Sequence, residues 1–201
     1  LNVAWALPTH FDDDTQRRSD ELDWLTVDHY ITLRTGSDVV EVETWMDNRC
    51  RDHRLRLCIP SGLNVRKAHA GGAFDVILRN ASLPHDPSWE QPHVLTQHFS
   101  QFVALQDRIS GIAVLCPGSN EYEAVANDDG DGLDLRLTML RATGWLSRDG
   151  FATRRNRAGP CFEAPGAQCL GDYWMRWGLM PFEGGWDKAG AHEAAEALAA
   201  Q

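Results

Sequence analysis

The sequence contains no long apolar run and no surplus of basic residues. No stretch reaches the roughly 18 consecutive apolar residues that a membrane-spanning helix needs, so no membrane partner is expected. The 19 Lys and Arg are outnumbered by 29 Asp and Glu, and the formal net charge is -10. Because phosphate binding requires a basic surface, this balance argues against nucleic acid as a partner. A neutral partner such as a sugar is compatible with the charge.

Cysteine is scarce, and its spacing forms no disulfide or zinc framework. The count of five is odd and no CxxC pair occurs, so neither a zinc knuckle nor a set of disulfides is expected. In one regular strand Cys50 and Cys58 would share a face and lie too far apart to bond. We therefore predict five free thiols and a reducing compartment. The five are Cys50, Cys58, Cys116, Cys161 and Cys169.

Common catalytic motifs are also missing, since no GxSxG, phosphate-binding loop or dinucleotide fingerprint occurs. Glycosidases need two carboxylates that flank the scissile bond. Glu121 and Glu123 would share one face of a strand, but alternating Glu is common on exposed strand faces. We therefore assign no catalytic residue to this chain.

One acidic segment resembles the first half of a calcium loop. "NDDGDG" places Asn127, Asp129 and Asp131 at suitable offsets. The twelfth position is Thr138, where a bidentate Glu should stand, and the intervening residues have a strand pattern. The sequence therefore predicts a tight acidic hairpin and no metal ligand.

Alternation of polar with apolar or β-branched residues dominates the rest of the chain. The alternating segments lie at 24–36, 38–48, 53–60, 74–80, 99–107, 111–118, 122–127, 133–143 and 172–182. Only 189–201, rich in Ala, Glu and Leu, has a helical composition. This pattern predicts an all-β protein, an antiparallel β-sandwich with a short C-terminal helix. The segment 148–168 has no pattern and is longer than an ordinary loop, which is typical of loops that are functional or cover something.

The N-terminal part carries mixed charges and no signal peptide, because no basic segment precedes an apolar core. We expect residues 1–20 to be an exposed, charged lead-in and residues 21–201 to form the sandwich domain. The chain starts at Leu1, and we expect it to be cut from a longer polypeptide.

Three segments follow one another in a specific order: "NRCRDHRLRLCIPSGL" at 48–63, "FSQFVALQDRISGIAVLCPGSNEYEA" at 99–124 and "LRLTMLRATGWLSRDGFATRRNRAGPCFEAPGAQCLG" at 135–171. Together they resemble the C-terminal β-domain of family 38 glycoside hydrolases, the α-mannosidases and mannosylglycerate hydrolases. "DHRLR" and "PGAQC" favour the bacterial-type branch. Ser119 departs from the family pattern, which has an apolar residue at this turn, and puts the packing of the turn in question.

The resemblance implies a super-sandwich of the galactose mutarotase-like type that follows an N-terminal catalytic barrel. In this family of retaining α-mannosidases the barrel carries the nucleophile, the acid/base and the zinc ligands, and none of its motifs matches here. We therefore expect zinc in the absent barrel, no cofactor in this chain and no activity of the chain alone. The implied partners are that barrel and a mannose-containing carbohydrate, the implied location is the bacterial cytoplasm, and a homo-oligomer stays open.

The basic strand after Asp52 has two interpretations. In the structural one, Arg54 and Arg56 share a face and pair with Glu41 or Glu43 on a neighbouring strand, while the leucines between them fill the core. In the functional one, side chains of this strand and its neighbours face the barrel or the substrate, because a guanidinium can bond oxygen pairs bidentately. The candidate residues are His53, Arg54, Arg56, Glu121, Tyr122 and Arg141.

Two classes without catalysis remain as alternatives. A stand-alone carbohydrate-binding module would show coplanar exposed aromatic rings, and the eight Trp make that arrangement available. A module that mainly holds an oligomer or a barrel together would show an exposed apolar patch.

Overall fold

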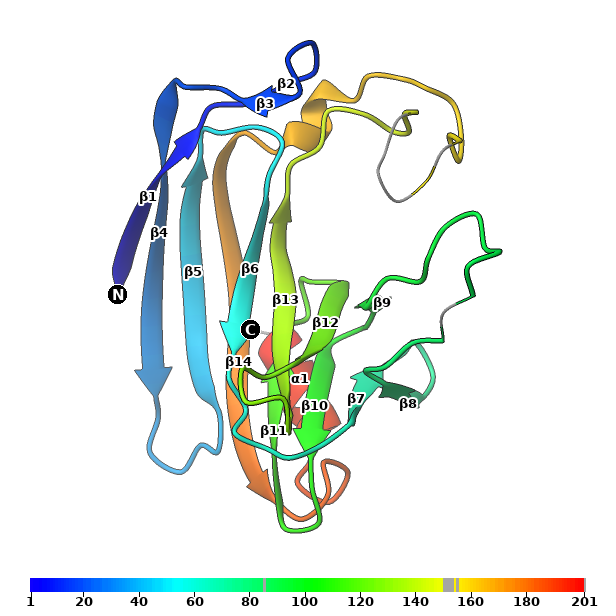
Figure 1. Ribbon diagram of the computed structural model, residues 1–201. Helices are drawn as coiled ribbons and strands as arrows, with labels where there is room; N and C mark the ends of the chain where they lie inside the picture. Colours follow the sequence, from blue (N-terminus) through cyan, green and yellow to red (C-terminus); the bar gives the residue numbers. More distant parts are fainter. Residues whose placement is uncertain (85, 150–153, 155, 201) are drawn as a thin grey trace.

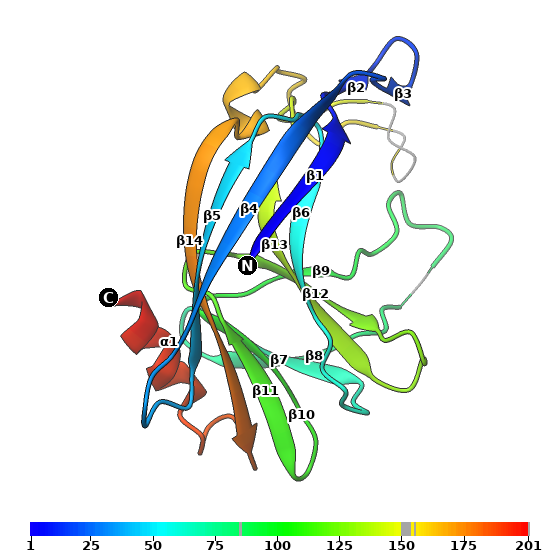
Figure 2. The same ribbon diagram turned by 90° about the vertical axis from the view of Figure 1, so that its left-hand side faces the viewer.

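Two antiparallel sheets lie face to face, and one helix packs on the outside of the larger sheet (Figures 1 and 2). The computed structural model describes residues 1–84, 86–149, 154 and 156–200. The large sheet has eight strands in the order β1-β4-β5-β14-β11-β10-β7-β8, the small sheet has the order β6-β13-β12-β9, and β2 and β3 form a separate hairpin. The predicted antiparallel sandwich with a C-terminal helix is therefore confirmed.

The elements have the following bounds. The strands are β1 Asn2–Pro8, β2 Phe11–Asp12, β3 Arg17–Arg18, β4 Leu22–Leu33, β5 Val40–Asn48, β6 Arg54–Ile59, β7 Lys67–Gly71, β8 Val76–Asn80, β9 Thr96–His98, β10 Phe102–Gln106, β11 Ser110–Leu115, β12 Glu121–Ala126, β13 Leu133–Arg141 and β14 Gly171–Glu183. A 3-10 turn spans Pro165–Gln168, and the helix α1 spans Ala191–Ala199.

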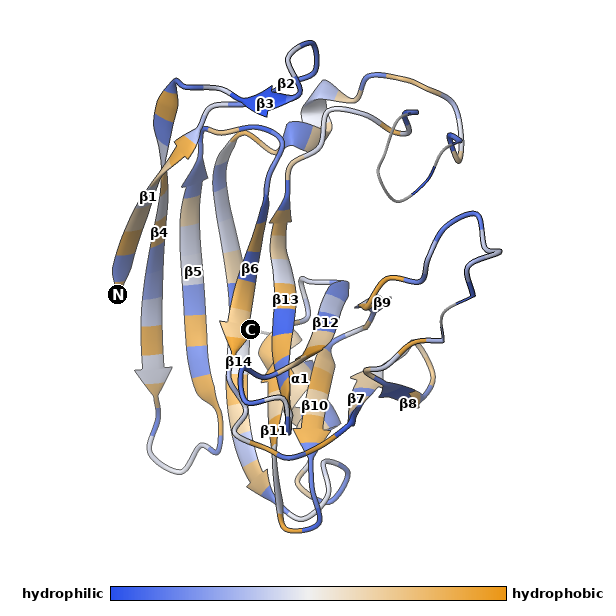
Figure 3. Ribbon diagram, in the orientation of Figure 1, coloured by the Kyte–Doolittle hydropathy of each residue, from blue (hydrophilic) through white to orange (hydrophobic). Residues whose placement is uncertain are grey.

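The main core lies between the two sheets and draws apolar side chains from both. Its largest fully buried members include Phe99, Leu105, Tyr122, Leu135 and Leu137. Bands of hydrophilic and hydrophobic residues alternate along β5, β6 and β13 (Figure 3). Such alternation is what a strand with one buried face requires.

The helix α1 buries the opposite face of the strands at the centre of the large sheet. Ala191, Ala195 and Leu198, which share one helical face, pack with Phe102 and Met180 of β10 and β14. The central strands are therefore buried on both sides, which explains the nearly continuous apolar sequence of β11.

Residues 1–20 are not a separate lead-in. β1 pairs with β4 over its whole length and forms one edge of the large sheet. The β2–β3 hairpin then folds over the end of the sandwich and bonds to the β5–β6 connection, where the Phe11 amide donates to Asp52 Oδ2 at 3.1 Å. The charged residues between Phe11 and Glu21 are exposed or half-buried, as expected, but the strand before them belongs to the sandwich.

The acidic segment "NDDGDG" forms the turn between β12 and β13, which confirms the predicted hairpin. Asn127 Oδ1 accepts hydrogen bonds from the amides of Asp131 and Gly132, each at 3.2 Å. A side chain at Gly132 would meet the Leu63 carbonyl at 2.1 Å, so this close approach requires glycine.

The five cysteine thiols are free in the structure, as predicted. Cys50 and Cys58 do not share a strand, because Cys50 lies in the β5–β6 connection and Cys58 on β6. Burial raises the pKa of Cys116 to about 12, so this thiol stays protonated. No helix in the described ranges is long and apolar enough to cross a membrane.

Candidate functional site

A groove of about 1340 Å³ opens where β6 and β13 meet at one end of the small sheet. The β2–β3 hairpin and the segment that follows β13 gather at this end (Figure 1). The segment around Gln91 and Val94 closes a further side. The predicted loop 148–168 contributes to the groove through its described residues, while 150–153 and 155 lie outside them.

The floor of the groove carries one carboxylate between two guanidinium groups. Arg54 Nη1 lies 3.4 Å and Arg141 Nη1 3.9 Å from the Glu121 carboxylate, and Thr138 Oγ1 donates to it at 2.5 Å. Four of the predicted residues line the groove: His53, Arg54, Glu121 and Arg141.

A β-bulge explains how Arg141 reaches this face. β13 pairs with β6 so that Arg54 lies opposite Arg141, and the register shifts between Thr138 and Leu140. In a regular strand Arg141, three positions after Thr138, would point to the opposite face. The extra residue at the bulge returns it to the same face as Thr138 and Arg54.

Arg54 and Arg56 point to the same side of β6, away from the core, as predicted. Arg56 forms a close ion pair with Glu123, and both side chains are largely buried. Leu55 and Leu57 pack against core clusters on the other face. Arg54 lines the groove and Arg56 does not, so the two arginines lie in different environments although they share a face of β6.

The predicted acidic partners of these arginines are wrong. Glu41 pairs with Arg34 at 3.1 Å and Glu43 with Arg176 at 2.6 Å, both on the large sheet. β5 and β6 are neighbours in sequence but belong to different sheets, so a side chain of one cannot cross to the outer face of the other. The real partners, on β12, lie two strands from β6 across β13.

We expect Arg56→Ala to destabilise the chain more than Arg54→Ala. Removing Arg56 leaves the largely buried Glu123 without its cation, whereas Glu121 keeps Arg141 and Thr138. The Arg54 pair is partly exposed and should contribute at most about 1 kcal/mol. That corresponds to a melting temperature lower by about 2–4 °C for Arg54→Ala, and a larger shift for Arg56→Ala.

Thermal melting of the two variants beside Arg176→Ala, which removes the more exposed ion pair with Glu43 on the other sheet, measures this difference. If all three variants lowered the melting temperature equally, burial of the Arg56–Glu123 pair would not determine its contribution to stability.

His53 begins the groove wall and is chemically unusual. Both ring nitrogens are buried and have no hydrogen-bond partner in the described part of the chain. Burial lowers the pKa of His53, and the nearby Arg51 backbone opposes that shift only in part. The ring is therefore a neutral imidazole that offers one donor and one acceptor. Its main chain is fixed, because the His53 carbonyl accepts from the Ala142 amide at 2.8 Å.

Asp52 and Gln168 hold the groove together and were missed by sequence reasoning. Gln168 Nε2 donates to Asp52 Oδ1 at 2.6 Å, and the Asp52 amide donates to Gln168 Oε1 at 2.9 Å. Arg18 of β3 donates to the Asp52 carbonyl, so the β2–β3 hairpin is also bonded to Asp52. The only signal was indirect: Asp52 lies in "DHRLR" and Gln168 in "PGAQC", two of the segments that carry the family resemblance.

Tyr122 does not face the groove, contrary to the prediction. Its side chain is 1% exposed and packs edge-on against Phe99, with ring centroids 5.8 Å apart. Burial raises the pKa of its hydroxyl. Tyr122 alternates with Glu121 and Glu123 on β12, so it must point into the core when they point out.

Ser119 fits the turn before β12 despite its departure from the family pattern. The side chain is buried, and Ser119 Oγ donates to the Thr138 carbonyl at 2.9 Å. A satisfied hydroxyl can replace an apolar contact at little cost.

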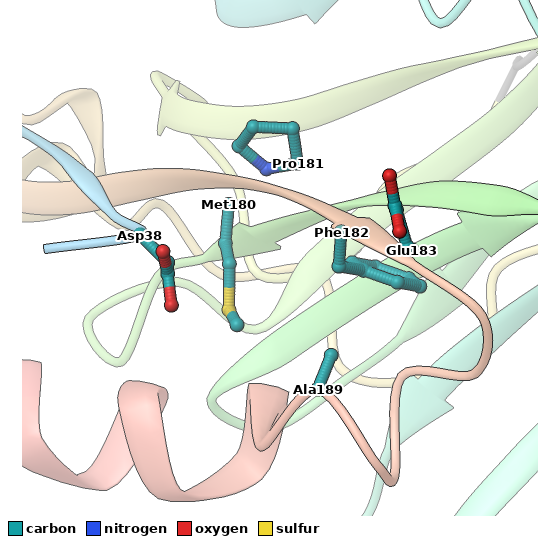
Figure 4. A pocket seen from close by; sticks show the side chains of 6 residues that line it. All are labelled: Asp38, Met180, Pro181, Phe182, Glu183 and Ala189. Atoms are coloured by element: carbon teal, nitrogen blue, oxygen red, sulfur yellow. The ribbon is translucent and has the colours of Figure 1, made fainter.

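A second hollow, of about 460 Å³, lies between β14 and the segment before α1 (Figure 4). Met180, Phe182 and Ala189 contribute apolar surface, and Asp38 and Glu183 are its charged groups. It brings together no set of donors comparable to the groove. In the described residues, no group of three or more His, Cys, Asp or Glu is placed to hold a metal ion.

The chain is thus an all-antiparallel β-sandwich with a charged groove at one end. The family described as "Glycosyl hydrolases family 38 C-terminal domain" matches residues 12–149, more than half of the chain. The chain therefore belongs to this family, which confirms the resemblance.

Individual relatives agree with the family. A protein of Halalkalibacterium halodurans named "Putative mannosylglycerate hydrolase" is 29% identical over 169 residues, which are 83% of this chain and 16% of that protein. The crystal structure of an alpha-mannosidase from Enterococcus faecalis V583 is 25% identical with a TM-score of 0.79, and covers 98% of this chain and 22% of that one. A second Enterococcus faecalis structure, of a protein in glycosyl hydrolase family 38, has the same fold with a TM-score of 0.76 and 24% identity, and covers 98% of this chain and 22% of that one.

The chain thus spans about a sixth of the curated relative that it matches and just over a fifth of the solved structures.

Proposed function

We propose that this chain is the C-terminal β-domain of a longer retaining glycosidase that hydrolyses α-mannosides. In this proposal an N-terminal barrel supplies the catalytic carboxylates and the zinc, and the groove of the β-domain faces that barrel or its substrate. Membership of the family, the names of the relatives and the short share of their length that this chain covers support the proposal.

The observation that carries the role of the groove is its charge. Among the described residues, five arginines and three acids line it, which is an excess of two positive charges in a chain with a net charge of -10. The arginines are Arg18, Arg54, Arg141, Arg148 and Arg154, and the acids are Asp13, Asp52 and Glu121. Such a local excess suits an oxygen-rich or anionic group from outside the chain.

Arg141 and Arg54 have the capacity to bind such a group. Each guanidinium carries five N–H donors, and the contacts with Glu121 use only part of them. The Arg141 side chain is 65% exposed, so its remaining donors are accessible. A planar guanidinium can bond two hydroxyls of a sugar, or a carboxylate of the substrate or barrel, in a bidentate manner.

An exchange in a related enzyme tests the proposal. In the Enterococcus faecalis alpha-mannosidase, the region matched by this chain is replaced by the chain itself, and hydrolysis of an aryl α-mannoside is measured. We expect activity in the exchanged protein. Arg141→Ala should lower kcat/KM by about 10- to 100-fold, because a hydrogen bond to a charged group contributes about 1.5–3 kcal/mol.

Arg34→Ala is the matched control, since it removes an exposed guanidinium that pairs with Glu41 on the large sheet, away from the groove. Melting curves establish that each protein is folded. If Arg141→Ala and Arg34→Ala leave kcat/KM equally unchanged, the groove does not serve the reaction.

A further inference from the structure

A second surface with unusual chemistry lies on the outer face of the large sheet. On β4, the side chains of Leu25 and Val27 are buried and point toward the small sheet. Because side chains alternate along a strand, Asp28 and Tyr30 point to the outer face of the large sheet. Trp174 of β14 points outward like Arg176, because Met175 and Trp177 face inward. The helix α1 packs on this side of the sheet against β10, β11 and β14 (Figure 2).

Tyr30 and Trp174 form a stacked aromatic pair on this face. Their ring centroids lie 6.0 Å apart with an angle of 23° between the planes. Tyr30 is 55% and Trp174 66% exposed, although both stand on regular strands. They reach toward one another over β5, which lies between β4 and β14. The stacking and the strand backbones fix both rings in place, so a ligand would lose little conformational freedom on binding.

The neighbouring side chains are mostly acidic. In the register of β4, β5 and β14, Trp45 stands between Asp28 and Trp174 in one row, and Glu43 stands between Tyr30 and Arg176 in the next. Asp172 is exposed two residues before Trp174. Arg176 is paired with Glu43 at 2.6 Å. The surface therefore presents carboxylate acceptors around an apolar centre and repels anions.

We propose that Tyr30 and Trp174 form a binding site for a neutral saccharide. The apolar C–H face of a pyranose ring packs on an aromatic ring, and its hydroxyls donate to the carboxylates at the rim. The acidic rim disfavours nucleic acids and acidic polysaccharides. The site goes beyond the proposed function, because it lies on the outer face of the large sheet and uses none of the residues that line the groove.

Affinity electrophoresis of the 201-residue chain tests the proposal, with yeast α-mannan or heparin in the gel. We expect α-mannan, and not heparin, to retard the chain. Trp174→Ala and Tyr30→Ala should each weaken the binding by about tenfold, the upper range for one aromatic contact. Phe74→Ala is the matched control, because Phe74 is a fully exposed aromatic residue on the turn before β8 and should leave the retardation unchanged.

Further measurements separate the alternatives. Sedimentation at rising protein concentration detects self-association, and circular dichroism confirms that each variant is folded. The proposal is overturned if the chain migrates equally with and without α-mannan, or if Trp174→Ala binds α-mannan as the unchanged chain does. A dimer that Trp174→Ala dissociates would assign the surface to a second copy of the chain instead.

Discussion

The isolated chain is expected to show no turnover of an aryl α-mannoside, with or without added zinc. A glycosidase needs one carboxyl group to protonate the leaving oxygen and another to act as nucleophile or base. In the groove, Glu121 is engaged by Arg54, Arg141 and Thr138. Asp52 is engaged by Phe11 and Gln168, and Asp13 by Arg148, so none of the three described acids is placed as a free acid or base.

The expected difference is large, because glycosidases and other enzymes accelerate their reactions by about 10⁶-fold or more. The measurement compares the isolated chain with the intact Enterococcus faecalis alpha-mannosidase at equal molar concentration. Turnover of the chain near that of the intact enzyme would refute the assignment of catalysis to an absent barrel. Glu123→Gln in the isolated chain would then show whether the Glu121 and Glu123 pair is responsible.

The sheet architecture could be predicted because half-buried strands leave a clear mark in the sequence. β4, β5, β6 and β13 alternate regularly, so their existence followed from single-residue patterns. β7 was missed, because its short segment "KAHAG" runs into a Gly pair that indicates a turn. β1 was missed because the charged residues after it dominated the interpretation of the N-terminal part.

Pairing between strands was the part that local patterns could not supply. Arg56 and Glu123 are 67 positions apart and meet only because β13 lies between β6 and β12. The acids nearest in sequence, Glu41 and Glu43, were the wrong partners, since sequence neighbours need not be sheet neighbours. The bulge that turns Arg141 to the groove leaves no clear signal in the segment "LTMLRA".

The residues of the groove were predicted mainly from the family resemblance. It directed attention to "DHRLR" and to Arg141, and four of the six candidate residues line the groove. The clamp between Asp52 and Gln168 joins residues 116 positions apart. A contact of this kind depends on the path of the whole chain, which no periodicity of a single segment can reveal.

Tyr122→Ala is expected to destabilise the chain by about 3–5 kcal/mol, as removal of a large buried aromatic side chain usually does. The ring is 1% exposed and lies against Phe99 in the core between the sheets, so the substitution leaves a cavity that the β-strands cannot collapse to fill. For a domain of this size, the melting temperature should fall by about 6–20 °C. Chemical denaturation with two spectroscopic probes measures the free energy of unfolding directly.

Tyr122→Phe and Glu121→Gln distinguish the core position from a functional one. Tyr122→Phe keeps the ring and removes only the hydroxyl, so its cost should stay near about 1 kcal/mol, the typical contribution of one hydrogen bond. Glu121, the preceding residue on β12, points to the groove, and its substitution should leave the core intact. If Tyr122→Ala melted like the unchanged chain, the tyrosine would have to lie outside the core, where it could again contact a barrel or a substrate. The alternation of β12 makes the opposite result the expected one, because a strand that points Glu121 and Glu123 away from the core must point the residue between them into it.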